Sequence, residues 1–137
     1  MSQIRNPLHR LTLNLLRIMT GALFIPHGAQ KLFGVLGGFG GQPGGTVPLL
    51  SLMGLAGLLE FFGGLLVLLG LFTRPVAFIL SGEMAAAYFM AHIPQGFWPL
   101  LNRGELAALY CFVFLFLSAS GGGDLSLDTV MSKGRRL

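Results

Sequence analysis

The chain has 137 residues, of which 53% are hydrophobic and only 10% are charged. A soluble domain carries about 25% charged residues, so this composition excludes a mainly water-exposed surface and indicates an integral membrane protein. The formal net charge of +4 does not indicate nucleic-acid binding, because the basic residues lie at the ends of apolar runs and form no stripe with interleaved aromatics.

Four apolar segments follow one another along the chain, and we expect each to form a transmembrane helix. A helix needs about 20 residues to cross the hydrocarbon layer, and the continuous runs lack the alternation of a β-barrel strand. The sequence therefore predicts an all-α, integral membrane four-helix bundle that forms a single domain over residues 1–137. Its helices are expected at residues 11–33, 48–72, 75–93 and 104–120.

Prolines and glycines predict where these helices begin and how they are joined. Pro48 and Pro75 suit the first turn of the second and third helices, where a missing N–H costs little. Residues 73–74 then leave a very short connection, so the second and third helices are expected to be antiparallel neighbours. The glycine-rich residues 34–45 predict a loop that lies on the bundle or at the membrane interface.

The distribution of lysine and arginine predicts that both termini lie in the cytoplasm, because cytoplasmic loops carry an excess of these residues. Leaving out Arg17, which lies inside a helix, does not reverse the bias. One side carries Arg5, Arg10, Arg17, Arg74, Lys133, Arg135 and Arg136, and the other carries Lys31 and Arg103. No small-x-small cleavage site closes the first apolar run, so we expect a retained helix and not a signal peptide.

The glycine-rich end of the fourth helix leads into a tail that we expect to be structural. Residues 121–123 are three consecutive glycines, which suit an exit from the membrane. Asp124 or Ser126 is a candidate N-cap for a short terminal helix that carries the basic end of the chain.

Neither a redox thiol pair nor a metal centre is predicted. Cys111 is the single cysteine, so an internal disulfide and a Cys-x-x-Cys pair are excluded, and we expect a small apolar residue there. A metal site built from His27, Glu60, Glu83 and His92 has no supporting ligand spacing.

The first helix carries polar side chains that are costly in hydrocarbon and are therefore candidates for function. Three- and four-residue steps place one set of side chains on a single face, with Gln30 next to it. This face consists of Arg17, Thr20, Phe24, His27 and Lys31. Pro26 removes a backbone hydrogen bond and is expected to kink the helix below His27.

Two glutamates lie near the middle of the second and third helices. Glu60 shares a face with Gly57 and Gly64, and small residues let another backbone approach closely, so Glu60 is expected to face protein. Glu83 is the corresponding acid in the third helix. His92 follows it by nine residues, which is half a turn away on an α-helix, so these two are not predicted to share a site.

Two interpretations of these groups remain open. In the first, the glutamates are protonated, or pair with Arg17, Lys31 or backbone groups, and hold the bundle together. In the second, they bind a polar ligand, which must span the roughly 9 Å between the depths of His27 and the glutamates. The candidate ligand-binding residues are His27, Gln30, Lys31, Glu60, Glu83 and Arg17, and the candidates for an apolar slot are Phe61, Phe62, Tyr88 and Phe89.

Several motifs together resemble the DoxX family of small four-helix membrane proteins. The matching residues are Arg17, His27-Gly28-x-Gln30-Lys31-Leu32, Glu60-Phe61-Phe62-Gly63-Gly64, Leu69-Gly70-Leu71-Phe72-Thr73-Arg74 and Gly122-Gly123-Asp124-Leu125-Ser126-Leu127-Asp128, in this order. The resemblance implies a multi-pass protein of the bacterial inner membrane. The resemblance also implies a link to redox systems: some members of that family are small subunits of a thiosulfate:quinone oxidoreductase, others are tied to membrane redox complexes, and others have no assigned activity.

Three functions are compatible with these observations. In the first, the protein is a quinone-linked redox subunit, in which His27 and Lys31 hydrogen-bond quinone oxygens and a glutamate moves the proton. In the second, it is a non-enzymatic scaffold subunit that uses Gly57, Gly64 and Gly70 to pack against other helices. In the third, it is a small transporter that requires oligomerisation. The expected partners are membrane lipid, a quinone, and other subunits or further copies of the chain.

Overall fold

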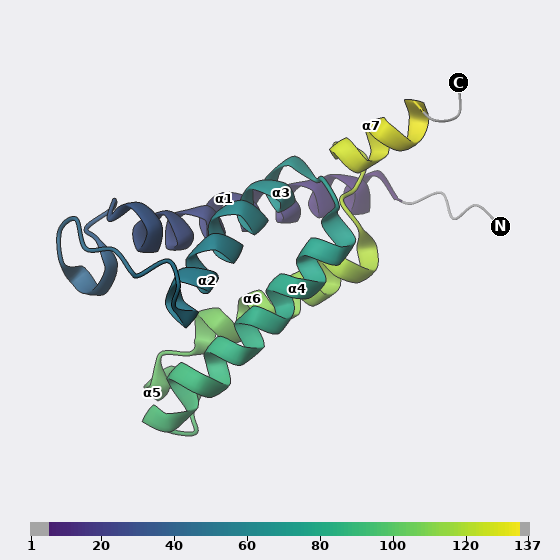
Figure 1. The fold of residues 1–137 in the computed structure, drawn as a ribbon. Coiled ribbons are helices and arrows are strands. Elements are labelled where there is room, and N and C mark those ends of the chain that lie inside the picture. The colour runs from purple at the N-terminus through teal and green to yellow at the C-terminus, as the bar shows by residue number, and fades with distance from the viewer. Residues whose placement is uncertain (1–5, 135–137) are drawn as a thin grey trace.

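A computed structural model describes residues 6–134, and these residues form helices and no strand (Figure 1). Four long helical segments make up most of the molecule. They are α1 (Pro7–Phe33); α2 (Leu52–Leu58), η2 (Leu59–Gly63) and α3 (Gly64–Leu69) in line; α4 (Thr73–Ala87) and η3 (Tyr88–His92) in line; and α6 (Glu105–Ser120). Shorter elements are η1 (Phe39–Gly41), η4 (Ile93–Gln95), α5 (Pro99–Asn102) and α7 (Leu127–Gly134).

The helix starts follow local capping chemistry more closely than proline positions. The first helix begins at Pro7, earlier than predicted, because the Asn6 side chain accepts a hydrogen bond from the Leu8 N–H at 3.0 Å. The second begins at Leu52, where the Ser51 hydroxyl accepts from the Gly54 N–H at 3.0 Å. The prediction that Pro48 starts this helix was wrong.

The other boundaries lie close to the predicted ones. The third helical segment begins at Thr73, which places Pro75 in its first turn as predicted. Helix α6 covers Glu105–Ser120, one residue shorter than predicted. Helix α1 continues as one α-helix through Pro26 to Phe33, and Gly34 ends it in the left-handed conformation with φ of 65°.

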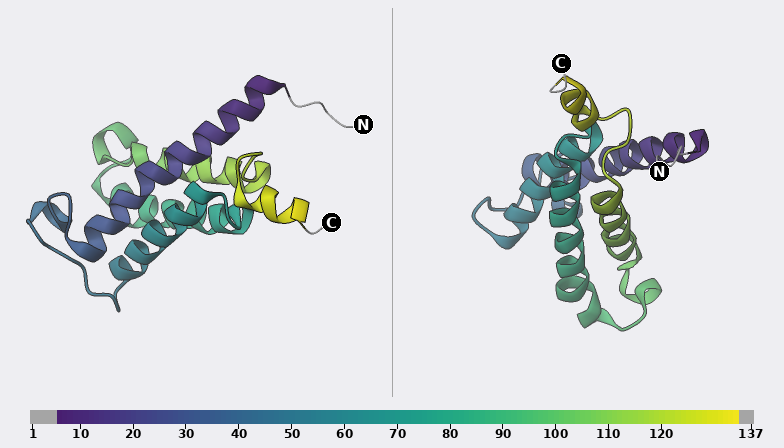
Figure 2. Two further views of the ribbon diagram at one scale, coloured as in Figure 1. Left: turned by 90° about the horizontal axis from the view of Figure 1, so that it is seen from above. Right: turned by 90° about the vertical axis from the view of Figure 1, so that its right-hand side faces the viewer.

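The four long segments form two antiparallel pairs. Helix α1 packs along α2, η2 and α3, and α4 packs along α6. The pairs meet at the end that carries α7 and separate toward the end that carries η1 and α5 (Figures 1 and 2). Helices α3 and α4 run in opposite directions from their shared turn, as predicted, but each has its longest contact with another helix.

Glycines allow α1 to lie directly against the second segment. A Cβ on Gly28 would come within 2.3 Å of the Phe61 nitrogen, and one on Gly21 within 2.6 Å of the Leu68 nitrogen. Neither position can carry a side chain unless the backbones move apart. This close approach places the side chain of Lys31 beside the η2 turn.

The apolar core lies mainly between α4 and α6 and is closed by one aromatic side chain from α1. Leu80 of α4 and Phe114 and Leu117 of α6 are almost fully buried. Phe24 of α1 packs edge-on against Phe114, with ring centroids 4.8 Å apart. This contact joins the two helix pairs.

The C-terminal segment is bound to the end where the pairs meet. The Asp128 carboxylate accepts hydrogen bonds from the Phe72 and Thr73 N–H groups at 2.8 and 2.9 Å, so it caps the start of α4. The Ser126 hydroxyl accepts from the Thr129 N–H at 3.3 Å and caps α7. The predictions of a structural tail and of Ser126 as a helix cap are confirmed.

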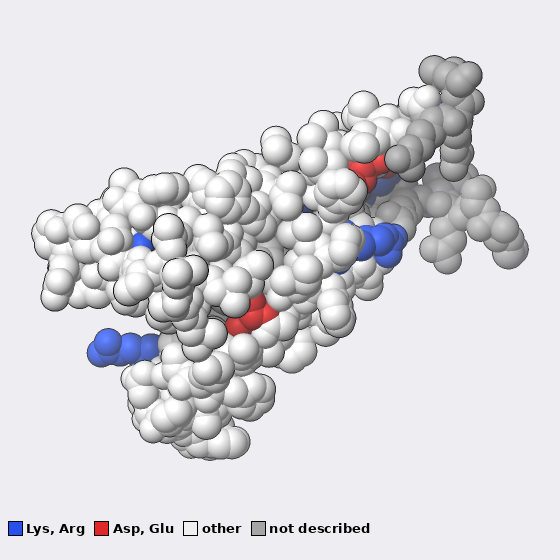
Figure 3. Space-filling view, in the orientation of Figure 1, with Lys and Arg blue, Asp and Glu red and all other residues white. Residues whose placement is uncertain are grey.

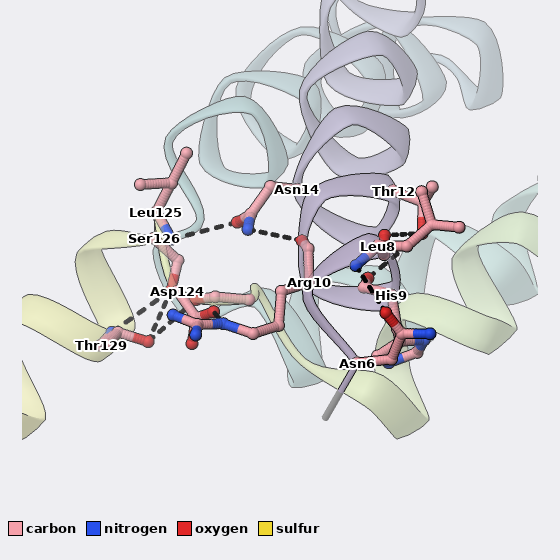
Figure 4. Close-up of polar contacts among 11 residues, drawn as sticks. Asn6, Leu8, His9, Arg10, Thr12, Asn14, Asp124, Leu125, Ser126 and Thr129 are labelled. Carbon is pink, nitrogen blue, oxygen red and sulfur yellow. Dashed lines mark hydrogen bonds and ion pairs between the residues drawn. The ribbon is translucent and has the colours of Figure 1, made fainter. Parts of the chain in front are cut away.

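The same segment also contacts the start of α1 (Figure 4). The Asn14 side chain accepts a hydrogen bond from the Leu125 N–H at 3.0 Å and donates to the Arg10 carbonyl at 2.8 Å. Arg10 forms an exposed ion pair with Asp124. Residues more than a hundred positions apart are therefore held together at this end.

The surface is predominantly apolar. Many leucine and phenylalanine side chains are more than half exposed, and the face shown in Figure 3 has few charged groups. Among the described residues, two helical stretches, Leu52–Leu69 and Thr73–Gln95, are long and apolar enough to cross a membrane. The apolar helix Glu105–Ser120 is shorter.

Candidate functional site

A cavity of about 790 Å³ lies between the two helix pairs, on the side where they separate. Its walls come from the C-terminal half of α1, from α2 and η2, from α4 and η3, and from the start of α6. Most of the lining is apolar. The polar lining residues are His27, Lys31, Glu60, Glu83, His92, Arg103 and Tyr110.

An ion pair forms one wall of the cavity. The Lys31 Nζ lies 2.6 Å from Glu60 Oε2, and the two side chains are only 12% and 7% exposed. The same Nζ lies 3.5 Å from the His27 carbonyl oxygen and 6.0 Å from the centre of the Phe39 ring. Glu60 therefore faces α1, and the prediction that it faces protein is confirmed.

Glu83 lies on the other helix pair and lines the same cavity. Both of its carboxyl oxygens are buried, and neither has a hydrogen-bond partner among the described residues. Buried carboxyl oxygens in proteins nearly always have such a partner. This unmet requirement makes Glu83 the most unusual polar group of the cavity.

Two π-helical turns flank the cavity, and one of them overturns a prediction. The η2 turn contains Glu60, and the η3 turn ends at His92. A π turn inserts an extra residue and changes the angular phase of the residues after it. His92 therefore lines the cavity together with Glu83, and its Nδ1 lies 3.0 Å from the Asn102 carbonyl oxygen. The prediction that these two residues do not share a site was wrong, because both line this cavity.

Tyr110 is a cavity residue that sequence reasoning missed. It is 8% exposed, its ring lies edge-on to that of His27 at 6.1 Å, and its hydroxyl makes no hydrogen bond within residues 6–134. Its burial could have been predicted from its helical spacing, because Tyr110 shares one face of α6 with the buried residues Ala107, Phe114 and Leu117. His27, predicted from the sequence, packs against both Tyr110 and Phe24.

Two of the candidate residues do not line the cavity. Arg17 lies in the N-terminal half of α1, away from the cavity, and its guanidinium donates to the carbonyl oxygens of Val67, Leu68, Gly122 and Leu125. The Gln30 amide donates to the Leu36 carbonyl in the following loop at 3.2 Å. Both side chains therefore donate their hydrogen bonds to backbone carbonyl oxygens.

The aromatic residues expected to line an apolar slot lie elsewhere. Phe61 and Phe62 pack edge-on against each other at 5.2 Å, and Phe61 also contacts Phe33. Tyr88 packs on Phe89 and His92. None of Phe61, Phe62, Tyr88 and Phe89 lines the cavity, so this prediction was wrong.

The family model named DoxX matches residues 12–93, which is more than half of the chain. This chain belongs to the DoxX family. Its polar cavity residues up to His92 lie within the matched region, whereas Arg103 and Tyr110 follow it. The sequence resemblance is confirmed.

Curated relatives extend the similarity along most of the chain. An uncharacterized protein of Haemophilus influenzae is 43% identical, with 86% of this chain and 89% of the relative covered. "Inner membrane protein YqjF" of Escherichia coli is 32% identical, covering 85% and 89%. "Putative oxidoreductase CatD" of Bacillus subtilis is 30% identical, covering 89% and 88%. We found no matching solved structure. The chain is a DoxX-family membrane protein.

Proposed function

We propose that this DoxX-family protein is a membrane subunit of a redox system and binds a quinone in the cavity between its helix pairs. The cavity carries this proposal, because it combines apolar walls with the Lys31–Glu60 pair and the unpartnered Glu83. A quinone has a planar apolar ring with two polar oxygens, which suits such a lining. The name of the Bacillus subtilis relative, "Putative oxidoreductase CatD", supports a redox role.

Three polar residues of the cavity, Lys31, Tyr110 and Glu83, have a direct role in this proposal. An ammonium group has three N–H donors, and Lys31 uses one on Glu60 at 2.6 Å, which leaves a donor for a ligand oxygen. The free hydroxyl of Tyr110 supplies a second donor. Reduction of a quinone consumes two electrons and two protons, so we assign the electrons to a partner redox protein and the proton transfer to Glu83.

Adding a short-chain quinone to the purified protein will raise its melting temperature. A ligand at 100 times its Kd stabilises the folded state by about 2.7 kcal/mol. A variant with His27→Ala and Tyr110→Phe will show a smaller rise, because both changes alter the cavity wall. Gln30→Ala is the matched control, since Gln30 lies on the same helix outside the cavity.

Thermal unfolding in detergent, followed by circular dichroism, measures this rise. An alkyl alcohol with the same tail length controls for detergent-like effects of the tail. Quinone binding in the cavity is refuted by an unchanged melting temperature in the wild type. It is also refuted by an equal rise in the His27→Ala/Tyr110→Phe variant.

We also propose that the four long segments cross the bacterial inner membrane with both termini in the cytoplasm. Arg10, Arg74 and Lys133 lie at the end where the helix pairs meet, and Lys31 and Arg103 line the cavity at the other end. This distribution of basic residues is the one expected if the end that carries α7 lies in the cytoplasm. Of the other basic residues in the sequence argument, Arg17 lies inside α1, and Arg5, Arg135 and Arg136 lie outside the described residues.

Labelling with a membrane-impermeant maleimide tests this orientation. On a Cys111→Ala background, Gln42→Cys will react in intact spheroplasts and Ser132→Cys will react only after permeabilisation. Both positions are exposed, so accessibility to the reagent depends on the side of the membrane. The opposite labelling pattern would invert the proposed orientation.

A further inference from the structure

We infer that Glu83 makes the cavity selective for the hydroxyl-bearing form of its ligand, so that a hydroquinone binds more tightly than the corresponding quinone. This inference rests on the proposed function and adds a specificity-determining residue to it. The observation behind it is the burial of both Glu83 oxygens without a hydrogen-bond partner in residues 6–134. Glu83 is a lining residue of the cavity, so its carboxyl group reaches an occupant, and gains the missing partner, once it turns from its buried position toward the cavity.

The chemistry of a carboxyl group sets what that partner must be. An ionised carboxylate only accepts hydrogen bonds, and a protonated one still has a carbonyl oxygen that accepts. In both protonation states, at least one oxygen of Glu83 therefore needs a donor. A quinone has no O–H and leaves this oxygen unpartnered, whereas each hydroxyl of a hydroquinone donates one hydrogen bond.

The Lys31 ammonium on the opposite wall of the cavity does not distinguish the two forms in this way. The Lys31 ammonium is a donor only, and its side chain is held by Glu60 at 2.6 Å. The oxygen atoms of a quinone and of a hydroquinone both accept hydrogen bonds, so both forms satisfy the Lys31 side. The difference in affinity arises at Glu83, because leaving a buried acceptor unpartnered is costly.

Equilibrium dialysis of the full chain in detergent, under anaerobic conditions, tests the inference with a short-chain quinone and its hydroquinone. We expect the wild type to bind the hydroquinone at least about tenfold more tightly. Glu83→Leu removes both oxygens and will bring the ratio of the two dissociation constants close to one. Glu105→Leu is the matched control and will keep the wild-type ratio, because Glu105 is exposed and outside the cavity lining.

A second variant covers the case in which Glu83→Leu does not fold. Glu83→Gln keeps an acceptor and adds an N–H₂ donor, so quinone binding will gain relative to hydroquinone binding. The dissociation constant of the quinone, divided by that of the hydroquinone, must therefore be smaller in this variant than in the wild type. Melting temperatures of all variants, measured without ligand, show which of them are folded.

The possible failures are distinguishable. Equal wild-type affinity for the two forms overturns the selectivity and leaves quinone binding in place. An unchanged ratio in Glu83→Leu or Glu83→Gln shows that selectivity arises from another residue and overturns the role of Glu83. If neither form binds the wild type, the proposed function fails, and this inference fails with it.

Discussion

Replacing Lys31 by methionine will lower the free energy of unfolding by about 3–5 kcal/mol, because it leaves a buried carboxylate without its counter-ion. The side chain of Glu60 is only 7% exposed, and water cannot readily replace the ammonium group at 2.6 Å. The loss is measured by thermal or denaturant unfolding in detergent. It is the largest effect expected for a single change in the cavity wall.

Neutralising both partners separates the cost of an unpaired charge from the value of the pair. Lys31→Met combined with Glu60→Gln will recover most of the lost stability, since replacing a buried ion pair by neutral groups is often close to neutral. Arg10→Met is the control. Its ion pair with Asp124 is exposed, with side chains 57% and 47% accessible, and its loss will cost less than about 1 kcal/mol. A double variant as unstable as Lys31→Met would contradict this explanation.

Replacing Arg17 by methionine will lower the free energy of unfolding by more than about 3 kcal/mol and will release the C-terminal segment. The guanidinium donates to carbonyl oxygens of Val67, Leu68, Gly122 and Leu125. Each buried acceptor that loses its donor costs about 1–3 kcal/mol. Arg17 is only 1% exposed, so water does not readily take the place of its N–H groups.

Hydrogen exchange distinguishes a local role of Arg17 from a general loss of stability. In Arg17→Met, the Leu125 and Asp128 amides, which donate to Asn14 and Gly70, will lose protection before those of α4 and α6 do. Arg103→Met is the control, because the Arg103 side chain is exposed and makes no hydrogen bond in the described residues. Its stability will stay within about 0.5 kcal/mol of the wild type. Uniform loss of protection in Arg17→Met would refute the local role.

Arg17 lies toward the end of the molecule where the two helix pairs meet, and Lys31 lies toward the end where they separate. At the α7 end, Arg17 and Asp128 join α1, α3, α4 and the C-terminal segment through hydrogen bonds to the backbone. At the other end, the helix pairs separate and leave the cavity between them. The hydrogen bonds at the α7 end therefore hold the two helix pairs in the orientation that creates the cavity.

Properties that depend on composition and local spacing were determined by the sequence alone. The predominance of apolar residues indicates a membrane protein, and four apolar runs correspond to the four long helical segments. Helical periodicity placed Arg17, Thr20, Phe24, His27 and Lys31 on one face of the first helix, and this face is turned into the protein. The glycines near Glu60 correctly indicated that it faces another helix.

Only the tertiary structure decided which of these groups meet. The Lys31–Glu60 pair, the carbonyl contacts of Arg17 and the Asp128 cap join residues 29 to 108 positions apart. Such contacts depend on how the helix pairs cross, which local spacing does not encode. His92 reached the cavity through a π turn, and Tyr110 through the packing of α6 on α1. The physical reason is that the depth and the helix face of a side chain are set by its own helix. The residue that it contacts depends on the arrangement of all four helical segments.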